Sequence, residues 1–264
     1  MAGAAPVADA EYGCLAFDVF LMERWDHTAD PADDAKQWES AVHAYLALTP
    51  RQRHPYHQES LKRKNARYKV DSGLAARLFI PHQTLLERSV SVRRASQTSP
   101  DPLWVRTCYA PEFDSAYASM AAHVVGVGGN VIDRAGALDD SNIYSFDGDW
   151  ARVLLRLPEL CDVVRFANEE LHEEREQEIE GAEGEMERLS MKVVERLYIV
   201  DREALEKGLV KVIWLDCHGE CLWNNKIRPE GMLDFTGAWR AMVSLDEILE
   251  TFAEKSEKGA RLLF

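Results

Sequence analysis

Residues 196–215 have the sequence RLYIVDREALEKGLVKVIWL. Two apolar runs, 196–200 and 210–215, have the length and the β-branched content of buried strands. Between them, Asp201 can cap a short helix over 202–207, and Gly208 suits the end of that helix. A strand, a helix and a second strand in this order predict an α/β domain.

The same alternation extends to both sides of this stretch. A strand is expected over 103–107 and a helix over 112–124, where Phe113, Tyr117 and Met120 share one face. Further expected elements are a strand at 127–133, a turn at 218–220 that leads into a chain segment at 221–223, and a helix at 245–255. The sequence therefore predicts an α/β domain over residues 103–264, with a small sheet and flanking helices.

The N-terminal part of the chain shows helical patterning only. A first helix is expected over 14–26, and Asp30 followed by Pro31 can begin a second. Thr49 and Gln52 form a capping-box pattern that opens a third helix, which runs to about residue 68. Residues 74–86 can form a further helix. We expect a helical module over residues 1–88, whose core contains Phe17, Phe20, Trp38 or Tyr45, and Tyr56.

A polar segment separates the two parts. Residues 89–102, SVSVRRASQTSPDP, are rich in Ser, Thr, Pro and Arg, which is typical of a linker. Within it, Ser96 follows two arginines and resembles a substrate of basophilic kinases. Phosphorylation of Ser96 would add negative charge next to the helical module.

The composition excludes several classes of protein. The chain has 264 residues with a net charge of −14, so a uniformly basic nucleic-acid coat is excluded. Its apolar runs are far shorter than the ~20 residues that span a bilayer. Five scattered cysteines favour a reducing compartment, so a nuclear or cytoplasmic location is expected.

Positive charge gathers in the expected third helix. Residues 51–69 carry seven basic side chains against Glu59 alone. Such a cluster can contact phosphates even in an acidic protein. The candidate DNA-binding residues are Arg51, Arg53, Lys62, Arg63, Lys64, Arg67 and Lys69.

Residues 12–72 resemble an HMG box. The residues that carry the resemblance are Ala16-Phe17-x-x-Phe20, Tyr45-x-x-Leu48-Thr49-Pro50, His54-Pro55-Tyr56 and the run KRKNARY at 62–68. The resemblance implies a three-helix box that binds duplex DNA in the minor groove, with apolar wedges inserted between base steps. Asp18 stands where the family usually has its wedge in helix 1, and a carboxylate there would repel phosphate. We expect phosphate-dominated binding with weak sequence specificity.

The C-terminal half weakly resembles an uncharacterised α/β domain family. The matching elements are Val105-Arg106-Thr107 and the segment VDREAL at 200–205. This resemblance implies no activity.

An acidic run interrupts the C-terminal half. From Glu169 to Glu187 there are ten Glu residues and one basic residue, Arg175. The ordinary interpretation is a solvated helical or mobile insertion. The alternative is a docking segment for a basic protein partner or for the chain's own basic helix.

No motif of the sequence predicts a catalytic residue, a cofactor or a metal. Asp201 and Asp216 both end expected strands and could hold Mg²⁺, but a helix cap and a turn explain them better. Cys217, His218 and Cys221 lack the second ligand pair of a zinc site. Residues 126–129 lack the ending of a phosphate-binding loop and are interpreted as a turn.

Three functions remain open from the sequence. The first is an HMG-box-like, DNA-associated protein with a role in transcription, which binds duplex phosphates through its third helix. The second is a protein-interaction adapter whose box has lost DNA binding. The third is an α/β enzyme that uses the edge formed by Asp201 and Asp216.

Overall fold

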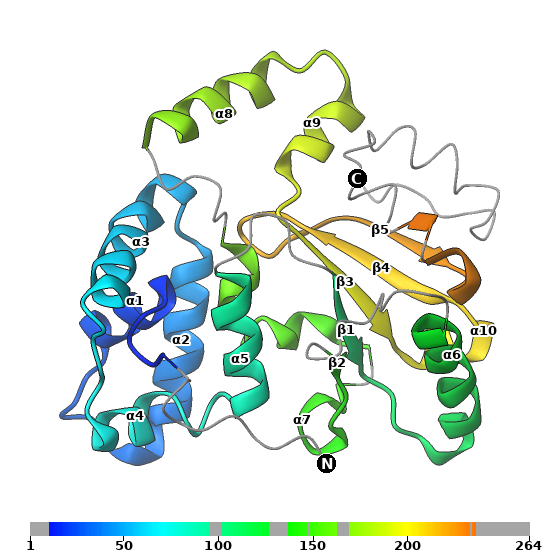
Figure 1. The fold of residues 1–264 in the computed structure, drawn as a ribbon, viewed down its shortest axis with the longest axis horizontal. Helices are drawn as coiled ribbons and strands as arrows, with labels where there is room; N and C mark the ends of the chain where they lie inside the picture. The colour runs from blue at the N-terminus through cyan, green and yellow to red at the C-terminus, as the bar shows by residue number, and fades with distance from the viewer. Residues whose placement is uncertain are drawn as a thin grey trace. The chain divides into compact units, whose positions relative to one another are not determined.

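Five strands of the described residues form one mixed sheet, in the order β2-β1-β3-β4-β5 (Figure 1). In the computed structural model, the described residues are 11–95, 102–126, 137–146, 148–162, 169–232 and 234–235. Strands β2, β1 and β3 run parallel, whereas β4 is antiparallel to both β3 and β5. The strands are β1 (Leu103–Arg106), β2 (Ala137–Leu138), β3 (Glu195–Val200), β4 (Val210–Leu215) and β5 (Cys221–Ile227). The protein is therefore a mixed α and β protein.

The pairing register places large side chains on one face of the sheet. Tyr198 pairs with Val212, and Trp214 pairs with Trp223. These four side chains belong to one buried core with residues of helices α6 (Asp114–Gly126) and α10 (Arg202–Lys207). Alternate residues of a strand share a face, so a single register is enough to bury this row of aromatic groups.

The β3–α10–β4 segment forms as its sequence predicts. Asp201 accepts a hydrogen bond from the backbone N–H of Ala204 at 2.8 Å, which caps α10. Gly208 ends the helix with φ at 64°, a left-handed conformation that glycine adopts without steric cost. These local signals are confirmed.

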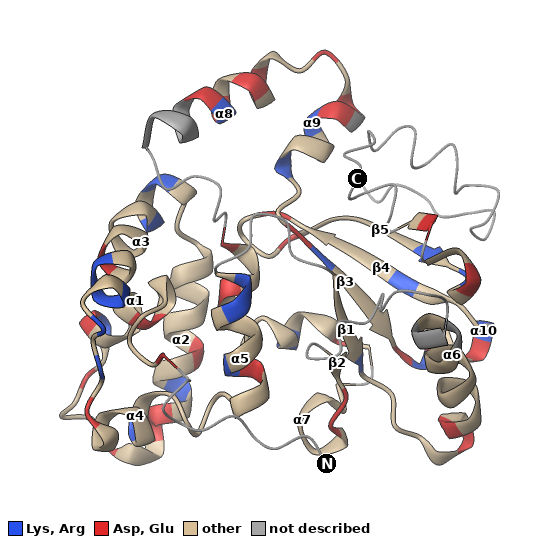
Figure 2. Ribbon diagram, in the orientation of Figure 1, with Lys and Arg blue, Asp and Glu red and all other residues tan. Residues whose placement is uncertain are grey.

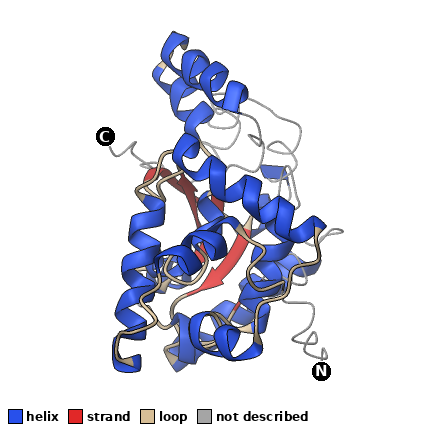
Figure 3. Cartoon of the chain, turned by 90° about the vertical axis from the view of Figure 1, so that its left-hand side faces the viewer, coloured by secondary structure: helices blue, strands red, loops and turns tan. Residues whose placement is uncertain are grey.

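Among the described residues from 11 to 95, helices are the regular secondary structure, and turns and loops join them (Figure 3). The ring of Phe17 lies 5.3 Å from that of Tyr45, and the ring of Phe20 lies 5.2 Å from those of Tyr45 and Tyr56. Trp38 packs edge-on against Phe17 at 5.2 Å. The predicted aromatic core is therefore confirmed. The helices are α1 (Ala16–Arg24), α2 (Asp34–Leu46), α3 (Pro50–Asn65), α4 (Ser72–Leu78) and α5 (Leu85–Arg94).

Capping explains where two of these helices begin. Thr49 and Gln52 exchange the two hydrogen bonds of the predicted capping box at the start of α3, at 3.3 and 2.9 Å. Thr84 and Glu87 do the same at the start of α5. The prediction that residues 89–102 are a linker is wrong for 89–94, because α5 continues through Arg94 and buries Val90 and Ser91. The Ser and Arg content of residues 89–94 suggested a linker. Their apolar and small side chains nevertheless fit the buried face of a helix.

The acidic run is helical except at residues 182–184. It comprises α8 (Glu169–Gly181) and α9 (Glu185–Lys192). Three expected features lie outside the described residues: the strand at 127–133, the helix at 245–255 and Ser96.

The chain forms two compact units, each described here by itself. The helical unit comprises Met1–Thr98, Ala151–Glu176 and Cys217–Gly219. The sheet unit comprises Ser99–Trp150, Gln177–Asp216 and Glu220–Phe264. The sequence had placed residues 151–176 and 217–219 in a continuous C-terminal domain, but the structure places them with the N-terminal helices.

In the part of the chain that the structure describes, no helix is both long enough and apolar enough to cross a bilayer.

Candidate functional site

The cationic end of α3 is the candidate binding surface, and we call residues 61–69 the α3 tail. Five of its nine residues are Lys or Arg and none is acidic. Lys62, Lys64, Arg67 and Lys69 are exposed, and basic residues cluster on this part of the ribbon (Figure 2). Arg51, at the other end of the helix, is exposed as well.

Two apolar side chains accompany the charges of the α3 tail. Leu61 is 46% exposed and Tyr68 is 39% exposed. Arg63 is less available than its neighbours, since it pairs with Glu59 at 3.1 Å and lies over the Tyr68 ring. Lys64 pairs with Glu11 at 3.5 Å across an exposed surface, where such pairs contribute little. The α3 tail therefore combines accessible positive charge with accessible apolar area.

Arg67 has an unusual backbone for a charged residue. Its φ is 51°, in the left-handed region that follows the last turn of α3. The backbone N–H of Tyr68 donates to the carbonyl of Arg63 at 2.9 Å, which closes the helix end. Glycine is the usual residue at such a position, because a Cβ atom there costs about 1 kcal/mol.

Arg53 was expected to contact DNA, and this expectation is wrong. Its side chain is buried, with 1% exposure. The guanidinium donates to the carbonyls of Tyr45, Leu46, Cys161 and Cys217, and to the carboxylate of Asp162. These acceptors, some of them from distant chain segments, compensate the buried positive charge of Arg53. Arg53 therefore connects parts of the helical unit and cannot reach a phosphate.

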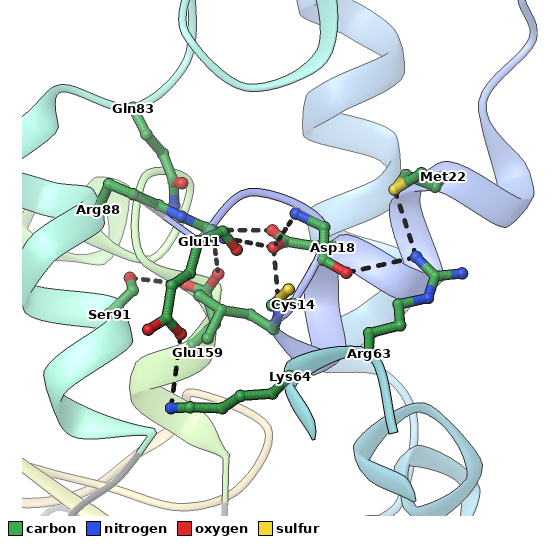
Figure 4. A network of polar contacts seen from close by, with 12 residues as sticks. Glu11, Cys14, Asp18, Met22, Arg63, Lys64, Gln83, Arg88, Ser91 and Glu159 are labelled. Atoms are coloured by element: carbon green, nitrogen blue, oxygen red, sulfur yellow. Dashed lines mark hydrogen bonds and ion pairs between the residues drawn. The ribbon is translucent and has the colours of Figure 1, made fainter. Parts of the chain in front are cut away.

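Asp18 was expected to face DNA from helix 1, and this expectation is also wrong. The carboxylate is fully buried and accepts two hydrogen bonds from Arg88 of α5 (Figure 4). The backbone N–H groups of Gly13 and Leu15 donate to it at 2.9 and 3.0 Å. Asp18 thus anchors the start of α1, and the position that the HMG resemblance assigns to a wedge is covered by α5.

The carboxylates that end β3 and β4 do not form a site together. Because β3 and β4 are antiparallel, Asp201 and Asp216 lie at opposite ends of the sheet. Asp201 caps α10 and forms an ion pair with Lys211. Asp216 accepts from the backbone N–H of Glu220 at 2.9 Å in the turn before β5. The cap and turn interpretation is confirmed.

Other side chains that could act in catalysis or metal binding form no such site in the described residues. His218 Nδ1 lies 2.8 Å from the carbonyl oxygen of Leu46. Across the described residues, His, Cys, Asp and Glu side chains form no group of three that could hold a metal ion. Burial raises the pKa of the Cys14 thiol and that of the Cys221 thiol, which disfavours the nucleophilic thiolate of either residue.

The sequence did not reveal the buried polar cluster around Arg88. Arg88 lies just beyond the helix that was expected over 74–86, and Ser91 lies in the supposed linker. Their partners Asp18 and Glu159 are 70 and 68 residues away along the chain. The Thr84–Glu87 capping box that begins α5 is a local feature, and it says nothing about distant partners.

Comparison with protein-family models, with curated proteins and with solved structures found no match to this chain.

Proposed function

We propose that the protein is a binding protein rather than an enzyme, and that its helical unit docks an acidic protein segment on the α3 tail. The observation that carries the proposal is the exposure of Leu61 and Tyr68 among the tail's cations. A protein partner can cover the apolar groups while its carboxylates meet the lysines. This corresponds to a protein-interaction adapter whose box has lost DNA binding.

The conformation of Arg67 supports this assignment. A position that favours glycine carries a charged residue instead, and strained residues of this kind are found preferentially at binding sites. The strain is explained if the side-chain charge is needed on the surface.

Duplex DNA is the second candidate, favoured by the tail's exposed cations and by the resemblance to an HMG box. Such binding would use phosphates alone, since Asp18 is held by Arg88 and α1 has no side chain free at the wedge position. Affinity would then fall steeply with salt, with a slope of about −0.9 for each phosphate contacted.

Two probes separate these candidates: a labelled peptide of alternating Glu and Leu, and a labelled short DNA duplex. We expect the peptide to bind more tightly in fluorescence anisotropy. Changing Lys62, Lys64 and Lys69 to Gln should weaken peptide binding about three- to hundredfold, at about 0.2–1 kcal/mol for each exposed pair.

A matched triple variant, Lys36→Gln, Lys192→Gln and Lys207→Gln, removes the same charge from other exposed sites and should bind normally. Leu61→Ser decides between the partners, because it should weaken the peptide and leave the duplex unaffected. Tighter binding of the duplex, together with indifference to Leu61→Ser, would assign the α3 tail to DNA. If neither the peptide nor the duplex binds, the proposed role of the α3 tail is refuted.

A further inference from the structure

Glu159 is a buried carboxyl group without a full set of partners. It lies in the 3-10 helix η5 (Pro158–Cys161) of the helical unit and is 7% exposed. Its Oε2 accepts a hydrogen bond from the Ser91 hydroxyl at 3.1 Å, whereas its Oε1 has no hydrogen-bond partner (Figure 4). A buried ionised oxygen in this state costs several kcal/mol.

The nearest cation is already engaged by another carboxylate. Nη1 of Arg88 is 3.9 Å from Glu159 Oε1, but 2.8 Å from Asp18 Oδ1. Nη2 of the same guanidinium also donates to Asp18, and it donates to the carbonyl of Glu11 at 2.9 Å. One guanidinium therefore faces two buried carboxyl groups, and it is committed to Asp18.

Two other cations of the helical unit, Arg53 and Arg156, are bound to other carboxylates. Arg53 of α3 is bound to Asp162, whose carboxylate also accepts from the Tyr45 hydroxyl. Arg156 is bound to Glu87 of α5. Within the described residues, the charged and titratable groups around η5 include Tyr12, Asp18, Tyr45, Arg53, His57, Glu87, Arg88, Arg156 and Asp162.

Burial raises the pKa of Glu159 to about 8, since the attraction of Arg88 is opposed by the repulsion of Asp18. When two carboxyl groups share one cation in a dry interior, one of them holds its proton. Asp18 has two backbone N–H donors and the guanidinium, whereas among the described residues the one hydrogen-bond donor to Glu159 is the Ser91 hydroxyl.

We propose that η5 docks on α1, α2 and α5 through protonated Glu159, so that a rise in pH favours the release of residues 158–162 from the helical unit. The docked segment contacts all three helices. Its release would take Cys161 and Asp162 away from Arg53 of α3. The segment is then a pH-sensitive latch on the helical unit.

The sign and size of the effect follow from the two protonation states. A released Glu159 has an ordinary pKa near 4.3, whereas the docked group keeps its proton to about pH 8. Between these values the released form loses a proton that the docked form retains. The opening equilibrium should therefore rise up to about tenfold per pH unit from roughly pH 5 to 8, and then level off.

Hydrogen exchange of the full chain measures this opening directly. The amides of Leu160 and Asp162 donate to the carbonyls of Leu157 and Glu159, each at 3.1 Å, and their protection factors, corrected for intrinsic exchange, should fall across that range. Amides of β3 (Glu195–Val200) provide the reference for global unfolding. Glu159→Gln should abolish the pH dependence, because the amide cannot ionise.

Two further variants keep the test decisive even if Glu159→Gln folds poorly. His57→Gln removes the imidazole 3.9 Å from Asp162 and should leave the slope intact. Asp18→Asn frees Arg88 to compensate Glu159, so the levelling-off should move to lower pH. A slope that persists in Glu159→Gln, a slope lost in His57→Gln, or a wild-type protein without any slope would each overturn the latch.

Discussion

Arg88 links two separate parts of the helical unit through one buried side chain. Its guanidinium holds Asp18 of α1 and the carbonyl of Glu11, and it lies over the ring of Tyr12 at 5.0 Å. A buried charge that loses its partner is left without water to replace it. The helical unit therefore depends on this pair more than on any exposed ion pair of similar geometry.

The first prediction concerns this pair. Arg88→Met should lower the free energy of unfolding by about 3–5 kcal/mol, because the Asp18 carboxylate stays buried and unpaired. Urea unfolding followed by circular dichroism measures the loss. The double variant Asp18→Leu with Arg88→Met removes both charges and should be less damaged than Arg88→Met alone. Equal or larger damage in the double variant would contradict the argument.

The same pair shows which residues sequence patterns can predict. The capping box of Thr49 and Gln52 and the cap at Asp201 were predictable, because each depends on residues within three positions. The roles of Asp18 and Arg53 were not, since each also binds partners far along the chain, 70 residues away for Asp18 and up to 164 for Arg53. The sequence shows which side chains are basic. Whether such a side chain binds a ligand or the protein's own carbonyl groups depends on its burial.

In helix α3, too, the local features could be predicted from the sequence and the long-range contacts could not. Its start and its aromatic contacts were predictable from capping and from helical spacing. Its two ends nevertheless serve different purposes: Arg53 near the start is buried, whereas the α3 tail is exposed. Helical periodicity alone could not separate them, because the face that is covered depends on η5, more than 90 residues further along the chain.

The second prediction concerns the end of this helix. Arg67→Gly should stabilise the protein by up to about 1 kcal/mol, since glycine adopts the positive φ without steric cost. The same change should weaken binding of the acidic peptide, because it removes one cation from the α3 tail. Thermal unfolding and fluorescence anisotropy measure the two effects. Arg67→Asn, which also tolerates this conformation, is the matched control for the charge. Destabilisation by glycine, or unchanged peptide binding, would contradict the prediction.

At the scale of the whole molecule, the two units are interleaved along the chain. The helical unit takes residues from three separate stretches, and the sheet unit takes residues from three others. The sequence suggested a simple division near residue 89, because the composition changes there. The polar or apolar composition of a segment indicates how much of it is exposed to solvent. It does not indicate that Ala151–Glu176 belongs to the same unit as the N-terminal helices.

The last prediction follows from this interleaving. A fragment that ends at Thr98 keeps all of α1 to α5 but loses residues 151–162 and 217–219. Arg53 would lose Cys161, Asp162 and Cys217 as acceptors, and the indole N–H of Trp38 would lose the carbonyl of Leu155. Each broken hydrogen bond to a buried group costs about 1–3 kcal/mol, and a small domain has a total stability of only about 5–15 kcal/mol.

We therefore expect the fragment 1–98 to lack cooperative unfolding and to give a poorly dispersed amide NMR spectrum. Joining residues 151–162 to its end through a flexible Gly and Ser linker should restore dispersion, because that segment supplies Leu155, Glu159 and Asp162. The same linker followed by a scrambled version of 151–162 controls for length and composition. A fragment 1–98 that folds by itself would show that the N-terminal helices are an independent domain, and that the buried contacts of Arg53 and Trp38 add little to their stability.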